Sequence, residues 1–488
     1  MTPVASGNFR QIGLAVSRDV RRTLGGDVDT SSFQSARLIP TTGIKGSQEQ
    51  ERRATSALLA VIQAVPEFAR AILKPLGAPA GKVSTFIEPD FTLGDKKVRP
   101  DGLIVVQRGS KTWAMLVEVK TNKNDLIAEQ INTYLDVCRD QHIDGLLTIS
   151  NQVLTLAGGH PAEGVDGRKT RKTTLEHYSW MRVLSEAQLQ KEHRGIADPD
   201  QAWILGELIR YLESPASGAL EFTDMGDSWV SVRQAAVNGT LSATDKGAVD
   251  VAQRFESLLR FTSFKLSARL GVDVSPVTSK LAKSDPDKHM KQVVAQLAGE
   301  SKLAGAIRVE DTVAPLEVTV DLRASQVLCS VTIDAPREGR PQTRVNWLLR
   351  QLKSAPPGTR VETFAKRGRQ ASAACLLSEA IDAPQTLLPT DGKEITSFTV
   401  TLISSMGSKR GEGKNSFTGS FLTAVDAAYI ALLENLHAWT PKAPKLPPQQ
   451  TPEPAAFATT TGGSADGEDD ANTPESAGPL LPDTTDPV

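Results

Sequence analysis

Apolar residues recur with helical spacing near the start of the chain. Residues 8–24 show this period together with several arginines, and residues 25–46 are rich in Gly, Ser and Thr, which predicts a connecting loop. Apolar positions then recur over 47–65, where Ser47 and Gln50 match the capping box that begins many helices. A second, shorter helix is expected over residues 67–74, which end just before a proline.

Strand-forming segments follow these helices. One later segment, 125–140, has a different spacing, because Ile127, Ile131 and Leu135 recur at helical intervals and Asn124 offers a cap before them. An apolar strand reached through a helix is expected to lie parallel to a neighbouring strand. The expected strands are 83–88, 103–107, 113–120 and 145–150, and a further helix is expected over 200–213.

The character of the sequence changes near residue 240. A long helix is expected over 243–270, and from Thr440 onward Pro, Thr, Gly and acidic residues are typical of a disordered segment. Between them we expect strands at 315–323, 326–334, 359–365 and 396–405 and helices at 343–353 and 416–437. The predicted fold class is α/β, with a mixed sheet flanked by helices, then a second α+β domain and a disordered acidic tail. The predicted divisions are 1–46, 47–235, 240–440 and 441–488.

Charge and cysteine content narrow the classes of function. The net charge is −2, but residues 441–488 hold eight acidic residues and two lysines, which leaves 53 basic and 49 acidic residues, about +4, elsewhere. That mildly basic balance is compatible with a nucleic-acid partner. The three cysteines are widely separated, so neither a zinc site nor a disulfide framework is expected. With no signal-peptide-like or membrane-spanning apolar run, we expect a cytoplasmic protein without a membrane partner.

Three charged residues interrupt two of the apolar strands. Asp101 stands at the start of one strand, and Glu118 and Lys120 stand at the end of the next, on one face because side chains alternate along a strand. A hairpin across Gly109 would bring Asp101 beside Glu118. Burying such charges is unfavourable unless they are paired or hold a metal. Two carboxylates and a main-chain carbonyl, here that of Val119, are oxygen ligands suited to Mg²⁺.

Pro100-Asp101 and Glu118-Val119-Lys120 resemble the signature of the PD-(D/E)XK nuclease superfamily, the fold of many restriction and recombination nucleases. The resemblance covers about residues 47–180 and implies a restriction-endonuclease-like core. It also implies that Asp101 and Glu118 bind metal and that Lys120 assists the attacking water.

Gln130 and Tyr134 resemble the QxxxY motif of the RecB-like branch of that superfamily. The two residues are four apart on the expected helix 125–140, so they share a face and are expected to approach the metal or a phosphate. RecB-like nucleases commonly carry an upstream histidine, and the first histidine of this chain is His142. The resemblance therefore points to the superfamily rather than to that branch.

The superfamily often adds an acidic residue from its first core helix. Glu51 is the expected residue here, Glu49 is the second candidate, and Glu88 on the preceding strand is the third. The alternative for Glu51 is an ordinary solvated charge on a helix surface.

The expected function is a Mg²⁺-dependent deoxyribonuclease, with Mn²⁺ as a possible substitute and DNA as the partner, acting in defence against foreign DNA or in repair. Cutting both strands often needs two active sites, so a homodimer is one expected arrangement. One alternative is a non-catalytic nucleic-acid-binding or regulatory protein that reuses the nuclease fold. In that case Asp101, Glu118 and Lys120 would form a structural salt-bridge cluster or the remnant of an inactive nuclease core. Another is an RNA-directed nuclease, although the sequence shows no RRM or KH signature.

Overall fold

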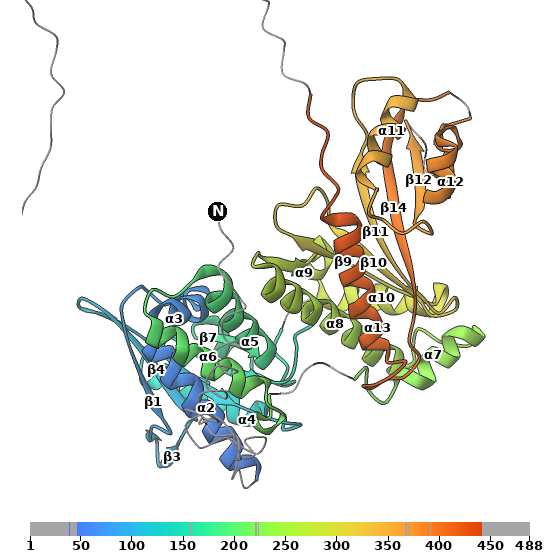
Figure 1. Ribbon diagram of the computed structural model, residues 1–488. Coiled ribbons are helices and arrows are strands. Elements are labelled where there is room, and N and C mark those ends of the chain that lie inside the picture. The colour runs from blue at the N-terminus through green and yellow to red at the C-terminus, as the bar shows by residue number, and fades with distance from the viewer. Residues whose placement is uncertain are drawn as a thin grey trace, which may run out of the picture. The chain divides into compact units, whose positions relative to one another are not determined.

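A computed structural model describes residues 39, 46–156, 159–219, 222, 224–366, 368, 370–390 and 392–441. The helix expected over 8–24, nearly all of the loop expected over 25–46 and all but the first residue of the expected tail 441–488 lie outside these residues. The described chain contains two larger sheets and many helices (Figure 1). The expected α/β mixture, with a mixed sheet flanked by helices, is confirmed.

The first sheet has the strand order β1-β4-β5-β6-β7 (Figure 1). Its first three strands, β1 (Lys82–Ile87), β4 (Gly102–Arg108) and β5 (Lys111–Val119), pair antiparallel. The last two, β6 (Gly145–Ser150) and β7 (Thr174–Ser179), extend the sheet in parallel from β5. The tight turn between β4 and β5 places Gly109 at a φ of 59°, which glycine adopts without steric cost. The expected hairpin and the expected parallel strand are therefore confirmed.

The sequence does not predict strand β7 or the small hairpin β2–β3. Glu176 and His177 interrupt the apolar run of β7, so neither strand alternation nor a continuous apolar segment is visible there. The hairpin strands β2 (Phe91–Leu93) and β3 (Lys96–Val98) have only three residues each. Segments this short carry too little periodicity to distinguish a strand from a loop.

Helices cover both faces of the first sheet. On one face, α2 (Ser47–Ala64) packs Leu58 and Leu59 into a buried cluster that includes Val117 of β5. On the other face, α4 (Ala128–Asp140) shares a second buried cluster with Leu116, the preceding residue of β5. The alternation of side chains along β5 therefore sorts the two helices to opposite faces. The other helical elements of this part are α3 (Pro66–Leu73), η1 (Lys74–Leu76), η2 (Lys169–Arg171), α5 (Trp180–Leu189), η3 (Gln190–Arg194), α6 (Pro199–Glu213) and η4 (Pro215–Ser217).

The helix starts expected from capping residues are wrong in two places. Ser47 is the first helical residue of α2 and Gly46 precedes it, with no side-chain cap. Helix α4 begins at Ala128, three residues later than expected, with Ile127 rather than Asn124 before it. Both caps fail for the same reason, because Gln50 and Asn124 form hydrogen bonds to distant parts of the chain instead of local ones.

The second sheet is antiparallel throughout, in the order β13-β12-β14-β11-β10-β9-β8. The expected hairpin across 323–326 is present, and the expected strands and helices of this region are found within a few residues. The strands are β8 (Val274–Pro276), β9 (Lys302–Val309), β10 (Leu316–Asp321), β11 (Gln326–Asp334), β12 (Arg360–Ala365), β13 (Ala373–Leu376) and β14 (Ile395–Ser405). The helices are α7 (Trp229–Asn238), α8 (Lys246–Leu270), α9 (Lys280–Ser284), α10 (Pro286–Glu300), α11 (Pro341–Gln351), α12 (Leu377–Asp382), η5 (Pro384–Leu387), α13 (Phe417–Ala428) and η6 (Tyr429–Leu433).

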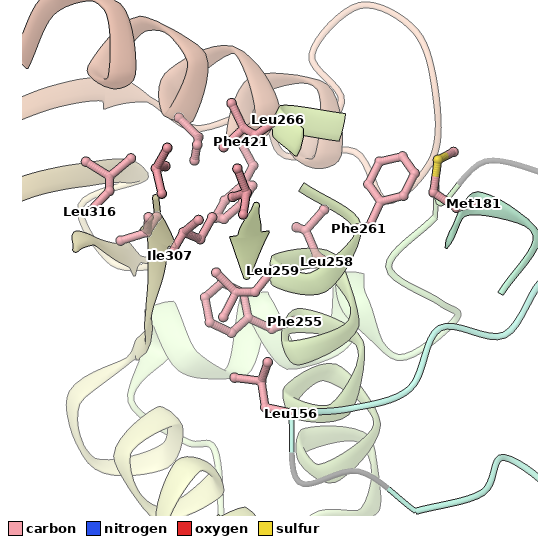
Figure 2. Close-up of a cluster of buried hydrophobic side chains, with 14 of the residues drawn as sticks. Leu156, Met181, Phe255, Leu258, Leu259, Phe261, Leu266, Ile307, Leu316 and Phe421 are labelled. Carbon is pink, nitrogen blue, oxygen red and sulfur yellow. The ribbon is translucent and has the colours of Figure 1, made fainter. Parts of the chain in front are cut away.

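Helix α8 supplies large apolar side chains to the core beside the second sheet. Figure 2 shows Phe255 and Leu259 on this helix, with Ile307 of β9 close to them. The rings of Phe255 and Phe421 of α13 meet edge to face, with 5.9 Å between their centres. A side chain at Gly305 of β9 would overlap Leu259, so glycine lets the strand approach the helix closely.

Among the described residues, no single helix is long and apolar enough to cross a membrane. Helix α2 together with α3 and η1 is long and apolar enough, but the chain bends by 111° between α2 and the segment formed by α3 and η1.

Candidate metal and catalytic site

The register of β4 and β5 brings Asp101 and Glu118 together. Gly102 is paired with Val117, so Asp101, one residue earlier, comes opposite Glu118. The Asp101 carboxylate is held there because its Oδ2 accepts a 2.7 Å hydrogen bond from the backbone N–H of Val119. The convergence of the two carboxylates is the arrangement that the sequence predicts for a hairpin at this position.

Lys120 and Glu51 complete a group of four charged side chains, which we call the carboxylate–lysine cluster (Glu51, Asp101, Glu118 and Lys120). The ammonium of Lys120 donates a 2.6 Å hydrogen bond to Oε1 of Glu118 and lies 3.8 Å from Oε2 of Glu51. The Glu118 side chain is only 1% exposed, whereas those of Lys120 and Glu51 are each 14% exposed. The cluster thus runs from a buried carboxylate to a partly open rim.

The other two acidic candidates do not join the cluster. Glu49 pairs with Arg53 one turn further along α2, at 2.8 Å. Glu88 pairs with Arg52 at 2.7 Å and has a φ of 46°, which ends the regular course of β1 before this residue. Of the three candidates, the structure places only Glu51 beside Lys120.

Gln130 and Tyr134 contact each other on α4 and lie beside the cluster. Nε2 of Gln130 donates to the Tyr134 hydroxyl at 2.8 Å, and that hydroxyl donates to the Arg99 carbonyl at 3.3 Å. Burial, followed by the charge of Glu118, raises the pKa of Tyr134, so its hydroxyl keeps its proton near neutral pH. Tyr134 therefore fastens the segment that leads into Asp101.

The electrostatics of the cluster are dominated by burial. Burial raises the pKa of Glu118 to about 7, the charge of Asp101 adds to this rise, and Lys120 opposes it. Burial also raises the pKa of Asp101, against the hydrogen bond from Val119. For Lys120, burial lowers the pKa, but the carboxylates of Glu118, Asp101 and Glu51 together outweigh burial, so the net pKa is raised. The lysine therefore stays charged, and the two carboxylates repel each other across the strand pair.

A network of amides that the sequence analysis missed fixes the loop after Lys120. The side chain of Gln50 accepts a hydrogen bond from Asn122 and donates one of 2.7 Å to the Ala216 carbonyl. Asn151 donates to the carbonyl oxygens of Asn122 and Gly218, both at 2.8 Å. These contacts hold Asn122 at a φ of 54°, a conformation that asparagine tolerates better than most residues. In the sequence, this network is indicated by nothing more than the Asn and Gln residues close to the charged motif, and such residues are too common to predict it.

Two further side chains position members of the cluster. Asn124 donates a 2.5 Å hydrogen bond to Oε1 of Glu51. The indole of Trp180, which is almost fully buried, donates to the carbonyl of Lys120 at 2.9 Å. Helix α2, the loop after β5 and helix α5 therefore all fix the geometry of this site.

His177 of β7, which is buried, and His160, which is partly buried in the loop after β6, form a second polar group around Thr148 of β6. Nε2 of His177 donates to the Gln152 carbonyl at 2.9 Å, so Nδ1 is the acceptor for the Thr148 hydroxyl at 3.0 Å. Nδ1 of His160 accepts from the Ala162 N–H, which leaves its Nε2–H to donate to Thr148 at 2.8 Å. Burial lowers the pKa of each histidine to about 4, so both are neutral at physiological pH.

The donor atoms of the cluster match the needs of a hard divalent cation. Oε2 of Glu118 is buried without a hydrogen-bond partner, which leaves a carboxylate oxygen free for a ligand. In the described part of the chain, no three His, Cys, Asp or Glu side chains are grouped to hold a metal. Asp101 and Glu118 are two carboxylates, which are oxygen donors of the type that such a cation takes. The expected third ligand, the Val119 carbonyl, stays a prediction.

No model of a known protein family matches the sequence. No curated protein matches it either. Any functional conclusion therefore rests on the residues and geometry of the site.

Proposed function

We propose that this protein is a metal-dependent nuclease that hydrolyses DNA phosphodiester bonds. The observation that supports the proposal is the carboxylate–lysine cluster, in which a strand pair sets two carboxylates opposite each other and a lysine beside them. Buried groups with opposed charge and perturbed pKa values concentrate at functional sites. A purely structural cluster would not need a second, repelling carboxylate.

In the proposed mechanism, Asp101, Glu118 and the Val119 carbonyl would hold Mg²⁺ or Mn²⁺. When bound there, such a cation would supply Lewis-acid chemistry and lower the pKa of a water molecule. Lys120 keeps its proton on Nζ, orients the attacking water by donating a hydrogen bond, and stabilises negative charge on the phosphate. Glu51 holds the ammonium from the outer side, and Tyr134 keeps the Arg99–Asp101 segment in place.

The proposal includes a restriction-endonuclease-like fold for residues 47–235. It is supported by the order of elements, namely an antiparallel three-stranded unit, a helix and then a parallel strand, with helices on both faces. Residues 240–440 would then form a second α+β domain that recognises DNA or assembles the enzyme. Defence or repair, and a homodimer for cutting both strands, remain part of the proposal.

One observation favours a second candidate function. The Lys120 ammonium is already paired with Glu118 at 2.6 Å, as in a structural ion pair of a nucleic-acid-binding or regulatory protein that lacks catalysis. That candidate predicts DNA binding that persists in EDTA and does not change in Asp101→Ala.

The deciding experiment measures cleavage of plasmid and linear DNA with Mg²⁺ or Mn²⁺. We expect cleavage by the wild type, loss of at least a hundredfold in Lys120→Ala, and no change in Lys123→Ala, an exposed lysine three residues away. Cleavage by the wild type that does not exceed that of Lys120→Ala across several substrates would refute catalysis.

A further inference from the structure

An exposed aromatic side chain lies next to the carboxylate–lysine cluster. Phe86 of β1 is 52% exposed, although most large aromatic residues of the described chain are buried. It is paired with Leu103 of β4, and Asp101 is two residues before Leu103, on the same face. Diagonal neighbours of this kind have Cβ atoms about 7–8 Å apart. The Phe86 and Asp101 side chains are therefore separated by about the length of one nucleotide.

The strand that carries Phe86 is open to a ligand. β1 is the edge strand of the described five-stranded sheet, and Figure 1 shows it beside β4. On the opposite face, Thr85 is tied to helix α2 through its hydroxyl, which donates to the Leu59 carbonyl at 3.0 Å. On the face that carries Phe86 and Asp101, α4 packs over Leu116 and Leu146, and the Phe86 side chain is left half exposed within the described part of the chain.

Positive charge is available near the same face. The β2–β3 hairpin presents the exposed residues Lys96 and Lys97, and Lys97 is only four residues from Asp101 along the chain. Phe91 of this hairpin packs against the same buried cluster as Leu103, the residue opposite Phe86. An exposed aromatic ring and nearby lysines are two elements by which proteins bind single-stranded nucleic acid.

We propose that Phe86 stacks on an unpaired base of the nucleic acid whose phosphate lies at the carboxylate–lysine cluster. This inference rests on the proposed function and deepens it, because it names single-stranded DNA, or a frayed or flapped end, as the preferred substrate. A base within a duplex has both faces covered by its neighbours, whereas an unpaired base offers a free face to the ring. The lysines of the β2–β3 hairpin contact the sugar–phosphate backbone on either side.

The chain itself provides a matched control. Ile87 follows Phe86, is 50% exposed, and points to the opposite face of the same strand. Truncating either residue removes a similar exposed apolar side chain from an edge strand, but only Phe86 faces the cluster. Phe86→Trp retains an aromatic ring, and Phe86→Leu retains apolar volume without a ring.

The experiment is fluorescence anisotropy of a labelled single-stranded oligonucleotide, titrated with full-length protein in EDTA so that no cleavage occurs. We expect Phe86→Ala and Phe86→Leu to weaken binding about tenfold, which corresponds to about 1.4 kcal/mol, because both variants lose the ring that stacks on a base. Phe86→Trp should bind like the wild type, Ile87→Ala should change affinity less than twofold, and binding to blunt duplex should be affected less.

Three results would overturn the inference. The first is no single-strand binding by the wild type, and the second is an equal loss in Phe86→Ala and Ile87→Ala. The third is a wild-type dimer in sedimentation that Phe86→Ala converts to a monomer without loss of affinity, which would assign the edge strand to a second copy of the chain. Cleavage without any effect of Phe86→Ala would refute only this inference. Phe86-dependent binding without wild-type cleavage would refute only the proposed nuclease activity.

Discussion

Replacing Glu118 by glutamine removes a carboxylate that the fold makes difficult to ionise. The side chain is 1% exposed, and it faces Asp101 across the strand pair. Glutamine has nearly the same shape and keeps an oxygen that can accept the hydrogen bond from Lys120. We therefore expect Glu118→Gln to abolish cleavage and yet to stabilise the folded protein at neutral and alkaline pH, as is common where a site is kept for function.

The size of this effect follows from the pKa of Glu118, which is raised from 4.5 to about 7. The unfolded state loses the proton near pH 4.5 and the folded state only near pH 7, so ionisation favours unfolding between these values. Stability of the wild type should fall as pH rises through this window and then stay level. The difference of about 2.5 pKa units corresponds to about 3 kcal/mol.

The assay is urea unfolding in EDTA at half-unit steps from pH 4.5 to 8.5, for the wild type and Glu118→Gln. The free energy of unfolding of the variant minus that of the wild type should rise by about 3 kcal/mol between pH 4.5 and 7. Glu207→Gln is the control, because Glu207 is similarly buried and, like Glu118, is paired with a cation, here Arg210 at 2.5 Å. A difference that is flat with pH, or a Glu118→Gln protein less stable than the wild type at pH 8, would refute the electrostatic argument.

Three further changes test other parts of the structure. As pH falls from about 6.5 toward 4, the free energy of unfolding of the wild type should decrease by about 1.4 kcal/mol per pH unit, because the unfolded state binds a proton that the buried His177 imidazole does not bind. Urea unfolding should show that His177→Asn removes this decrease and that a change at an exposed histidine, His437→Asn, does not. Gln50→Ala should lower the free energy of unfolding by about 1–3 kcal/mol and the cleavage rate at least tenfold, because it removes the hydrogen bonds that hold the Asn122 loop. An unchanged cleavage rate in this variant would contradict a positioning role for Gln50. Tyr134→Phe should lower the free energy of unfolding by about 1 kcal/mol and reduce the cleavage rate less than Lys120→Ala does. Complete loss of cleavage at unchanged stability would instead indicate that the Tyr134 hydroxyl contacts the substrate.

The sequence predicts the parts of this site that depend on strand geometry. Asp101, Glu118 and Lys120 follow from side-chain alternation and one hairpin, and both are local properties. Glu51 is a weaker prediction, because four consecutive acidic or amide residues, 48–51, stand near the start of α2 and helix periodicity does not decide which one faces the sheet. Its identity depends on how α2 packs, which is fixed by Leu59 and other apolar residues rather than by Glu51.

The features that the sequence does not predict arise from contacts between distant segments. Gln50 and Asn124 have the residue types of local caps, and both are used instead in hydrogen bonds across long stretches of chain. The sequence likewise does not predict that Phe86 is exposed, because a phenylalanine in a strand is expected to be buried. The sequence does not predict strand β7, because its polar residues, such as His177, form their hydrogen bonds with residues of other strands and loops.

The central claim is that Asp101 and Glu118 hold a divalent cation for phosphodiester hydrolysis. Calorimetric titration of Mn²⁺ into the metal-free protein at pH 8 tests this claim without knowing which nucleic acid is cut. We expect saturable binding by the wild type that is lost in Asp101→Asn and retained in Asp90→Asn, since the exposed Asp90 pairs with Arg99 outside the cluster. Absence of binding by the wild type, or equal binding by wild type and Asp101→Asn, would contradict the metal site and the mechanism proposed for it.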